Sequence, residues 1–429
     1  MANPPRFSSY AAIPRTAARW LTIVTPTSIA IGVAVAAFLV ALEAVTKFRE
    51  AHEWLLFLLP VAGATVGFAY HHWGRSVEGG NLQIIDEIHQ PAGGVPSRMA
   101  PLVLVGTLIT HLFGGSAGRE GTAVQMGGSI ASSFDRLILQ RIPSDFFRLE
   151  HEDRRELLQA GMAAGFGAVF GTPITGAVFA LEVLTANRIS LVAIIPCLLA
   201  AFVGDRTVAL LGVHHTAYPH FLLATAGQSV FTPSMFAKVM AAAVCFGLTS
   251  WLFVTCAHGV GTVLKKFVAV PWVRPVVGAC VVIALTFIVG SRDYLGLGVA
   301  NPPGSVSIVS SFTNGGAHPF SWLLKTVFTA VTVGSGFKGG EVTPLFFIGA
   351  SLGNALAVLM HAPVTLFAAL GFVAVFAGAT NTPIACTVMG LELFGIDAAI
   401  YIALTCIVAF MCSGQIGLYK RPHIEKNPA

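Results

Sequence analysis

The chain carries little charge. Only 10% of its 429 residues are Asp, Glu, Lys or Arg, whereas about 25% is usual in a soluble globular protein. Hydrophobic residues make up 55% of the chain, and the mean hydropathy is +0.76. This shortage of charge excludes an ordinary soluble domain. It predicts an all-α polytopic membrane protein in which one large membrane domain uses most of the length.

Residue pairs with metal-ligand spacing are also missing. The seven cysteines lie in apolar stretches and form no CxxC motif, so we expect small core side chains rather than metal ligands. The pairs His71-His72 and His214-His215 have no carboxylate at ligand spacing. We therefore expect no metal site and no cofactor.

Signatures of catalysis are scarce. The sequence contains no HExxH metalloprotease motif and no paired-aspartate motif. An intramembrane enzyme that uses Glu120 or Glu341 as an acid or base stays a distant alternative. We expect no enzyme activity and no nucleic-acid partner.

The net charge of +5 is concentrated outside the apolar runs. Basic residues precede the first run and follow the last one: Arg6, Arg15, Arg19, Lys420, Arg421 and Lys426. The positive-inside rule then places both termini in the cytoplasm of a multi-pass protein of the cell (inner) membrane. No small-residue cleavage site ends the first run, so we expect an uncleaved first helix. The predicted parts are a cytoplasmic segment 1–19, a membrane domain 20–415 and a short cytoplasmic tail 416–429.

The apolar runs have two lengths. Long runs lie near 20–45, 53–71, 98–115, 190–212, 233–258, 271–290, 319–334 and 396–412. Others, near 81–89, 122–138, 157–169, 173–186, 342–360, 364–379 and 382–394, are shorter than the roughly 20 residues that a span needs or are interrupted. Short, Gly- or Pro-interrupted helices at corresponding places in two halves point to a binding site near the membrane midplane.

Two segments of the chain correspond to each other. Residues 165–184 read GFGAVFGTPITGAVFALEVL, and residues 375–394 read VFAGATNTPIACTVMGLELF. Thr-Pro-Ile recurs, and Glu182 aligns with Glu392. Upstream, the Gly-x-x-Gly at 118–121 is matched to the one at 336–339. We infer an internal duplication with halves near 53–213 and 233–412. The duplicated context favours a structural or interface role for the two glutamates.

The segment Gly118-Arg119-Glu120-Gly121 opens an apolar run. The first N–H groups of a helix have no partner within it, and with the helix dipole they form an anion site. Glycine lets an ion approach that backbone closely. An ionised Glu120 can occupy this site itself, and a protonated Glu120 can leave it, so one side chain can couple protons to anions. The alternative is a Glu that only caps the helix.

Two further Gly-rich segments precede helices. In the first, Glu341, Val342 and Thr343 follow glycines, so Glu341 could relay protons and the Thr343 hydroxyl could bind an anion. In the second, Gly80 and Asn81 precede a short amphipathic run, where the Asn81 amide could bind an anion or cap the helix. Tyr419 follows the last long run, where an interface tyrosine is the alternative interpretation.

These segments, in this order, resemble the CLC family of chloride channels and anion/proton antiporters over roughly residues 20–420. Family members hold an anion between helix starts that carry GSGIP, GREGP and GxFxP motifs, together with a late tyrosine. By this resemblance Glu120 falls on the gating glutamate and Tyr419 on the tyrosine. Gly339-Gly-Glu-Val-Thr-Pro344 falls on the third motif.

The departures from the chloride members are similar to the fluoride/proton antiporter (CLC-F) branch. Gly80 or Asn81 replaces the first-motif serine, and Thr122 replaces the proline after GREG. Glu341 and Thr343 stand at positions that are usually apolar, and Val183 stands where typical antiporters have an internal glutamate. The branch implies a homodimer, one pathway per subunit and an inverted repeat with short, partly re-entrant helices.

The sequence therefore predicts a membrane antiporter that exports fluoride in exchange for protons, with Glu120 as the proton-coupled gate. Glu341 is the candidate for a second coupling group. The residues expected along the anion pathway are Gly80, Asn81, Gly118, Arg119, Gly121, Val342, Thr343 and Tyr419. The alternative is a chloride/proton antiporter or a passive chloride channel of the same family.

Overall fold

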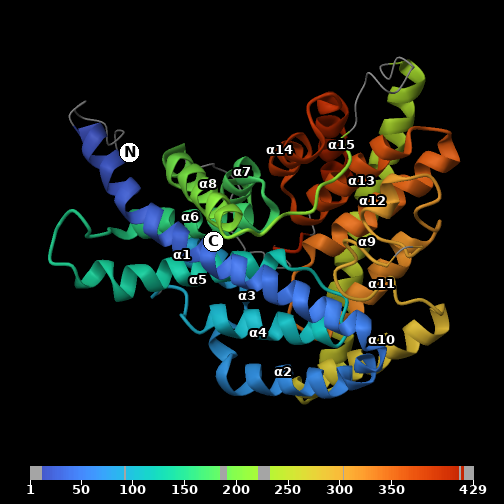
Figure 1. Ribbon diagram of the computed structural model, residues 1–429, viewed down its shortest axis with the longest axis horizontal. Helices are drawn as coiled ribbons and strands as arrows, with labels where there is room; N and C mark the ends of the chain where they lie inside the picture. The colour runs from blue at the N-terminus through green and yellow to red at the C-terminus, as the bar shows by residue number, and fades with distance from the viewer. Residues whose placement is uncertain are drawn as a thin grey trace, which may run out of the picture.

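The computed structural model describes residues 12–90, 93–183, 191–220, 232–302, 304–414 and 417–419, without the side chains of residues 12–15 and 191. The regular structure of these residues is helical, and Figure 1 shows the helices in one body. The segment before residue 12 and the tail after Tyr419, both predicted to be cytoplasmic, lie outside the described residues.

The α-helices follow the predicted apolar runs closely. They are α1 (Ala12–Ala51), α2 (Leu59–Trp73), α3 (Gly80–His89), α4 (Met99–Leu112), α5 (Glu120–Leu137), α6 (His151–Phe170), α7 (Pro173–Glu182), α8 (Ile194–Leu210), α9 (Pro233–Phe267), α10 (Arg274–Val289), α11 (Ser321–Gly334), α12 (Val342–Met360), α13 (Val364–Thr380), α14 (Pro383–Phe394) and α15 (Ala399–Cys412). Single 3-10 turns include η1 (Glu53–Leu58), η2 (Arg75–Val77), η3 (Leu139–Arg141), η4 (Leu191–Ala193), η6 (Pro271–Val273) and η7 (Ser310–Phe312).

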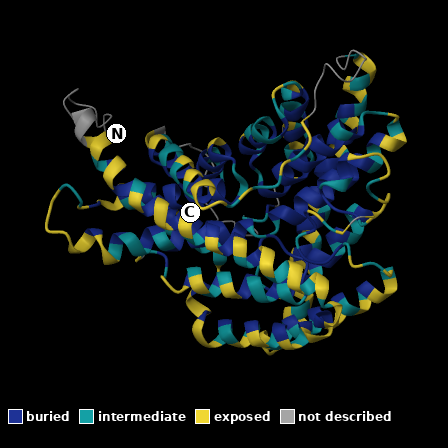
Figure 2. Cartoon of the chain, viewed as in Figure 1, coloured by how far each residue is buried: buried dark blue, intermediate teal, exposed yellow. Residues whose placement is uncertain are grey.

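Both predicted classes of helix are present, but some runs were assigned to the wrong class. Residues 342–360, predicted to be too short, form a helix long enough to span, whereas α4 and α15, in predicted long runs, have only 14 residues each. Among the described residues, five segments are long and apolar enough to cross a membrane: 16–51, 53–73, 233–267, 271–289 and 342–360. Others, such as α7 and α14, are apolar but only 10 and 12 residues long. The long α1 and α9 leave large apolar side chains exposed, as lipid-facing helices do, and Figure 2 shows this exposure along α1.

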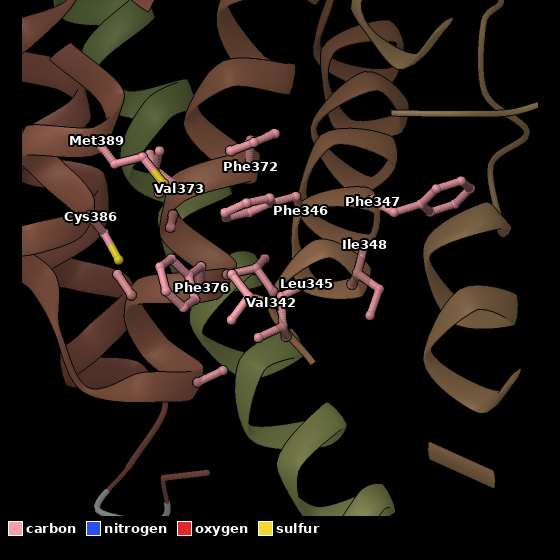
Figure 3. Packing of buried hydrophobic residues seen from close by; sticks show 14 of the residues in the cluster. Val342, Leu345, Phe346, Phe347, Ile348, Phe372, Val373, Phe376, Cys386 and Met389 are labelled. Atoms are coloured by element: carbon pink, nitrogen blue, oxygen red, sulfur yellow. The ribbon is translucent and has the colours of Figure 1, made fainter. Parts of the chain in front are cut away.

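The core lies where α12 packs against α13. Phe346 stacks on Phe372 with ring centroids 3.8 Å apart, as Figure 3 shows at close range. The backbones approach because both helices carry glycine at the contact: a Cβ on Gly349 would lie 2.0 Å from the Gly371 carbonyl oxygen. The expectation that all cysteines are core side chains is wrong for Cys280, which is exposed on α10, whereas Cys197, Cys386 and Cys406 are buried.

The duplicated Thr-Pro-Ile segments begin α7 and α14, and these helices contact each other. The Glu182 carboxylate at the end of α7 accepts from the N–H groups of Ile384 and Ala385 at 3.0 and 2.6 Å. The Glu392 carboxylate of α14 accepts from the N–H groups of Ile174 and Thr175 at 3.0 and 2.7 Å.

Each glutamate thus satisfies the free N–H groups at the helix start of the other half. This reciprocal pattern is that of two halves related by a two-fold axis, and it confirms the structural role predicted for Glu182 and Glu392.

A second symmetric contact corrects the predicted register of the duplication. Gly118 and Gly340 form an isolated antiparallel bridge, with N–H to carbonyl distances of 2.5 and 2.8 Å. Each glycine lies two residues before a helix start, at Glu120 for α5 and at Val342 for α12. Gly118 therefore corresponds to Gly340, and the match of 118–121 to 336–339 was wrong by four residues. The Gly-x-x-Gly at 336–339 is a match of letters only, since residues 340–343 read Gly-Glu-Val-Thr, and the helix start sets the register.

Candidate anion site

Glu120 lies at the first position of α5 and is almost fully buried, with 1% of its surface exposed. Its Oε2 atom accepts from the N–H of Arg119 at 3.0 Å and from the N–H of Thr343 at 3.1 Å. Its Oε1 atom accepts a short hydrogen bond from the Thr343 hydroxyl. The Arg119 guanidinium Nε lies 3.6 Å from the same oxygen. The carboxylate is thus held by donors suited to an anion.

Most of these donors belong to the other half of the chain. Thr343 is the second residue of α12, so its N–H is one of the free donors at a helix start. The starts of α5 and α12 are brought together by the Gly118–Gly340 bridge. Both helix dipoles then favour negative charge where the Glu120 carboxylate lies. The carboxylate occupies a place that is suited to an anion.

Glycine permits this close approach. A Cβ on Gly340 would lie 2.7 Å from the N–H nitrogen of Gly121, and one on Gly118 would lie 2.7 Å from the Glu120 Oε2 atom. Such distances do not occur for real Cβ atoms. The glycines at 118, 121 and 340 therefore serve the contact between the helix starts, beyond allowing an ion to approach.

Glu341 is half-buried immediately before α12 and interacts electrostatically with Glu120 and with Lys338. Val342, the first residue of α12, is buried in the core. The two candidates in this loop therefore have different surroundings: Thr343 binds the Glu120 carboxylate, whereas Glu341 lies beside a lysine.

The first motif reaches the site through Asn81. A Cβ on Gly121 would lie 3.2 Å from the Asn81 amide nitrogen, and the Tyr419 hydroxyl interacts with the Asn81 side chain. Tyr419 also interacts electrostatically with Glu341 and Glu120. Gly80 has a left-handed backbone, with φ of +54°, and faces the Gln125 side chain instead. Of the two candidates left open, Asn81 is therefore the one that faces the site.

A polar layer behind the Gly118 loop was not predicted. Ser116 bonds to Thr329 at 2.9 Å, and its N–H donates to the Thr332 hydroxyl at 3.1 Å. A ring nitrogen of the buried His111 lies 3.4 Å from the Gly118 carbonyl oxygen. These bonds fix the loop from α4 and α11. Single Ser, Thr and His residues in apolar runs gave no periodic signal that could have identified them.

The sequence of the same loop matches the Gly-x-Ser-x-Gly motif of α/β-hydrolases, since residues 114–118 read Gly-Gly-Ser-Ala-Gly. The catalytic form of that pattern exposes its serine on a sharp turn between a strand and a helix. Here Ser116 is fully buried, follows the helix α4 and is bonded to Thr329. The serine supports the loop and is not a nucleophile.

Comparison with known sequences gives relatives over nearly the whole chain. Residues 62–414 match the protein family described as "Voltage gated chloride channel". A "Chloride/fluoride channel protein" of Pseudomonas syringae pv. tomato is 47% identical, over 94% of this chain and 86% of that protein. An "H(+)/Cl(-) exchange transporter ClcA" of Vibrio cholerae is 24% identical, over 79% of this chain and 72% of that protein.

Solved structures share the fold. A structure described as a CLC-type fluoride/proton antiporter superposes with a TM-score of 0.85 and 33% sequence identity, covering 96% of this chain and 98% of that one. A slow cyanobacterial Cl⁻/H⁺ antiporter superposes with a TM-score of 0.75 at 18% identity, covering 92% and 94%. The second likeness concerns the fold alone.

Proposed function

Because the chain belongs to the voltage-gated chloride channel (CLC) family and is similar to its fluoride/proton antiporter branch, we propose that it exports fluoride from the cytoplasm in exchange for protons. Glu120 acts as the proton-coupled gate. The observation that carries this proposal is the Glu120 carboxylate bound at the start of α12, by the N–H and hydroxyl of Thr343. An ionised Glu120 excludes an anion from these donors, and a protonated one releases them.

Fluoride, rather than chloride, is favoured by the donors around the gate. A pathway for an ion must replace its hydration shell, and fluoride is small and strongly hydrated, so it needs strong donors. The Thr343 hydroxyl, the Asn81 amide and the free N–H groups of two helix starts supply them. The 47% identical relative is described as a chloride/fluoride channel protein, and the structural relative as a fluoride/proton antiporter.

Glu341 is assigned to coupling as well. It is a second carboxyl group within electrostatic range of Glu120, and Lys338 and Tyr419 interact with it. Glu341 lies at the start of α12, where an ionised Glu341 repels both an ionised Glu120 and a passing anion. A proton on Glu341 removes this repulsion. We assign the remaining residues, Asn81, Gly118, Arg119, Gly121, Val342, Thr343 and Tyr419, to the anion pathway, with Gly80 as support.

The same proposal covers location and assembly. The protein would span the inner membrane with both termini in the cytoplasm, as the basic residues at the two ends of the chain favour.

It would act as a homodimer with one pathway in each subunit. A groove of about 300 Å³ supports a protein contact on one side, since it lies where α7, α8 and α14 meet and is lined by apolar side chains such as Ile174, Leu198 and Ile384.

The test is reconstitution in vesicles, with a fluoride electrode and an internal pH dye. Outward fluoride movement down its gradient is expected to drive proton uptake, and an imposed pH gradient is expected to drive fluoride. Chloride gradients of the same size should move few protons. If chloride drives proton movement and fluoride does not, the protein is a chloride/proton antiporter. If either anion moves without protons, it is a passive channel.

A further inference from the structure

A cationic cavity lies apart from the Glu120 site, between α2, α9, α10 and the Gly-rich loop before α12. Its volume is about 530 Å³. The charged residues that line it are Arg75, Lys265, Arg274 and Lys338, with Glu78 as the one carboxylate among the lining residues. The four cations come from four separate places in the fold: η2, the end of α9, the start of α10 and the loop. Figure 1 shows α2 and α10 side by side along one edge of the molecule, and the two helices contact each other.

These cations form no close ion pair with the described residues, and Lys338 interacts with carboxylates only at longer range, those of Glu78 and Glu341. Within the described ranges, none of the ion pairs closer than 4.0 Å involves any of the four. Arg75 donates to the His71 carbonyl at 2.9 Å, and Arg274 donates to the Val268 carbonyl at 3.0 Å. The Arg75 Nη2 atom also lies 3.0 Å from a ring nitrogen of His71. These contacts orient the guanidinium groups, and most of their N–H donors have no other partner among the described residues. A cavity with surplus positive charge and free donors suits an anion that has several oxygen atoms.

The sequence neighbours of the cavity-lining residues indicate where this anion comes from. Three of its basic residues have an exposed aromatic residue two positions away: Trp73 for Arg75, Phe267 for Lys265 and Trp272 for Arg274. The exposed fractions of these aromatic side chains are 61%, 76% and 38%. Tryptophan gathers where membrane helices meet the headgroup layer, and basic pockets between helices bind anionic headgroups. Exposed aromatic residues so close in sequence to the basic lining residues favour a cavity at headgroup depth.

We propose that this cavity binds the phosphate headgroup of an anionic phospholipid. The volume of the cavity is far larger than a single halide ion requires, and three of its basic residues have exposed aromatic neighbours in the sequence. The phosphate would lie against Arg75, Lys265 and Arg274. Lys338 lies at the inner end, 4.0 Å above the Tyr70 ring, and interacts electrostatically with Glu78 and Glu341.

Lys338 connects the headgroup to the transport site. A phosphate in the cavity attracts the Lys338 ammonium and so weakens its attraction to the Glu341 carboxylate. Lipid composition is then expected to change the rate of anion exchange. This consequence rests on the proposed role of Glu341, whereas the headgroup site does not.

The site is tested by tryptophan fluorescence in phosphatidylcholine vesicles that contain a minority of brominated phosphatidylglycerol. Trp73 and Trp272 are exposed and lie two residues from the cavity-lining Arg75 and Arg274, so brominated phosphatidylglycerol should quench more than brominated phosphatidylcholine at the same fraction. In the double variant Lys265→Gln/Arg274→Gln, the relative association constant for phosphatidylglycerol should fall by about tenfold or more. Lys266→Gln is the matched control, because Lys266 is adjacent but does not line the cavity.

Excess quenching means stronger quenching by brominated phosphatidylglycerol than by brominated phosphatidylcholine. The site is supported if this excess is seen in the wild type and in Lys266→Gln and is lost in the double variant. Excess quenching that survives in the double variant overturns it, as does an equal preference for the two lipids in the wild type. Inorganic phosphate added to the vesicles distinguishes the source: if millimolar phosphate abolishes the excess, the ligand is a soluble phosphate and the lipid assignment is wrong. Because the readout is binding, a failure of fluoride exchange in the same vesicles leaves this result unaffected.

Discussion

At the scale of single residues, the chemistry of the site depends on one carboxylate with donors from two helix starts. Glu120 accepts from Arg119 in its own half and from Thr343 in the other. A charge with these bonds is stable although it is almost fully buried, because each oxygen has a donor. A proton on Glu120 removes the charge that these donors stabilise. In the proposed mechanism the gate and the proton site are therefore the same group.

The variant Glu120→Gln tests whether the gate and the proton site are the same side chain. The amide keeps the size of the side chain but cannot be ionised at neutral pH, so we expect proton movement coupled to fluoride to fall to the level of empty vesicles. The measurement is the pH-dye signal during fluoride flux. Glu43→Gln is the control, since Glu43 is exposed on α1 and should leave coupling unchanged. Unaltered coupling in Glu120→Gln would remove Glu120 from the mechanism.

Thr343 offers a second test at this scale. A hydrogen bond to a charged group contributes about 1.5–3 kcal/mol. Replacing the hydroxyl by a methyl in Thr343→Val should therefore raise the fluoride concentration for half-maximal flux by about tenfold or more. Thr343→Ser keeps the hydroxyl and should stay close to the wild type. The two variants are compared by initial fluoride flux at a series of concentrations. Equal curves for valine and serine would mean that the hydroxyl does not bind the ion.

At the scale of elements, helix starts rather than whole helices form the site. α5 and α12 meet end to end through the Gly118–Gly340 bridge, and α7 and α14 are joined by reciprocal glutamate caps. Both contacts pair backbone donors that would otherwise be unsatisfied in an apolar surrounding. Both also repeat the same interaction in the two halves. The duplication therefore has a direct structural role, because each half supplies hydrogen-bond partners for the backbone groups at the helix starts of the other half.

Gly340→Ala is expected to separate the two helix starts. The added methyl would lie 2.7 Å from the Gly121 nitrogen, a backbone atom that cannot move aside cheaply. We expect fluoride flux to be lost while the helix content, measured by circular dichroism, is retained. Gly259→Ala is the matched control: Gly259 lies within α9, where a Cβ would meet nothing within 4 Å, so flux should be unchanged. Wild-type flux in Gly340→Ala would show that the close contact is dispensable.

At the scale of the whole molecule, the exposed apolar surface has two uses. One part contacts lipid, as on α1, α2 and α10, and another surrounds the groove between α7, α8 and α14. In the proposed homodimer this second face is buried against its copy. Ile195 on α8 and Ile384 on α14 are 70% and 53% exposed there.

The dimer is tested by light scattering in detergent, where the protein mass is expected to be twice the 44.9 kDa of the chain. The double variant Ile195→Gln/Ile384→Gln should shift the population toward a single chain, because it places two amides in an apolar contact. Val61→Gln/Ile288→Gln introduces two amides at exposed positions on α2 and α10, with 62% and 79% of the side chains exposed, and should remain dimeric. A wild-type protein with the mass of one chain contradicts the proposal.

The sequence by itself determined the class of protein, the short interrupted helices, the duplication and the glycine-flanked Glu120 at a helix start. These are local properties: composition sets burial in lipid, and glycine beside an acidic residue marks a helix start that can hold an anion. Only the tertiary structure decided which helix starts face each other. The residues that donate hydrogen bonds to Glu120 and Glu182 across the repeat lie 223 and 202 residues away in the chain. The tertiary structure also brings Asn81, rather than Gly80, close to Gly121 and Tyr419, and it shifts the register of the repeat by four residues. A local sequence pattern identifies which groups can donate or accept in such contacts. Which donor meets which acceptor depends on how distant segments pack, so it is known only from the folded chain.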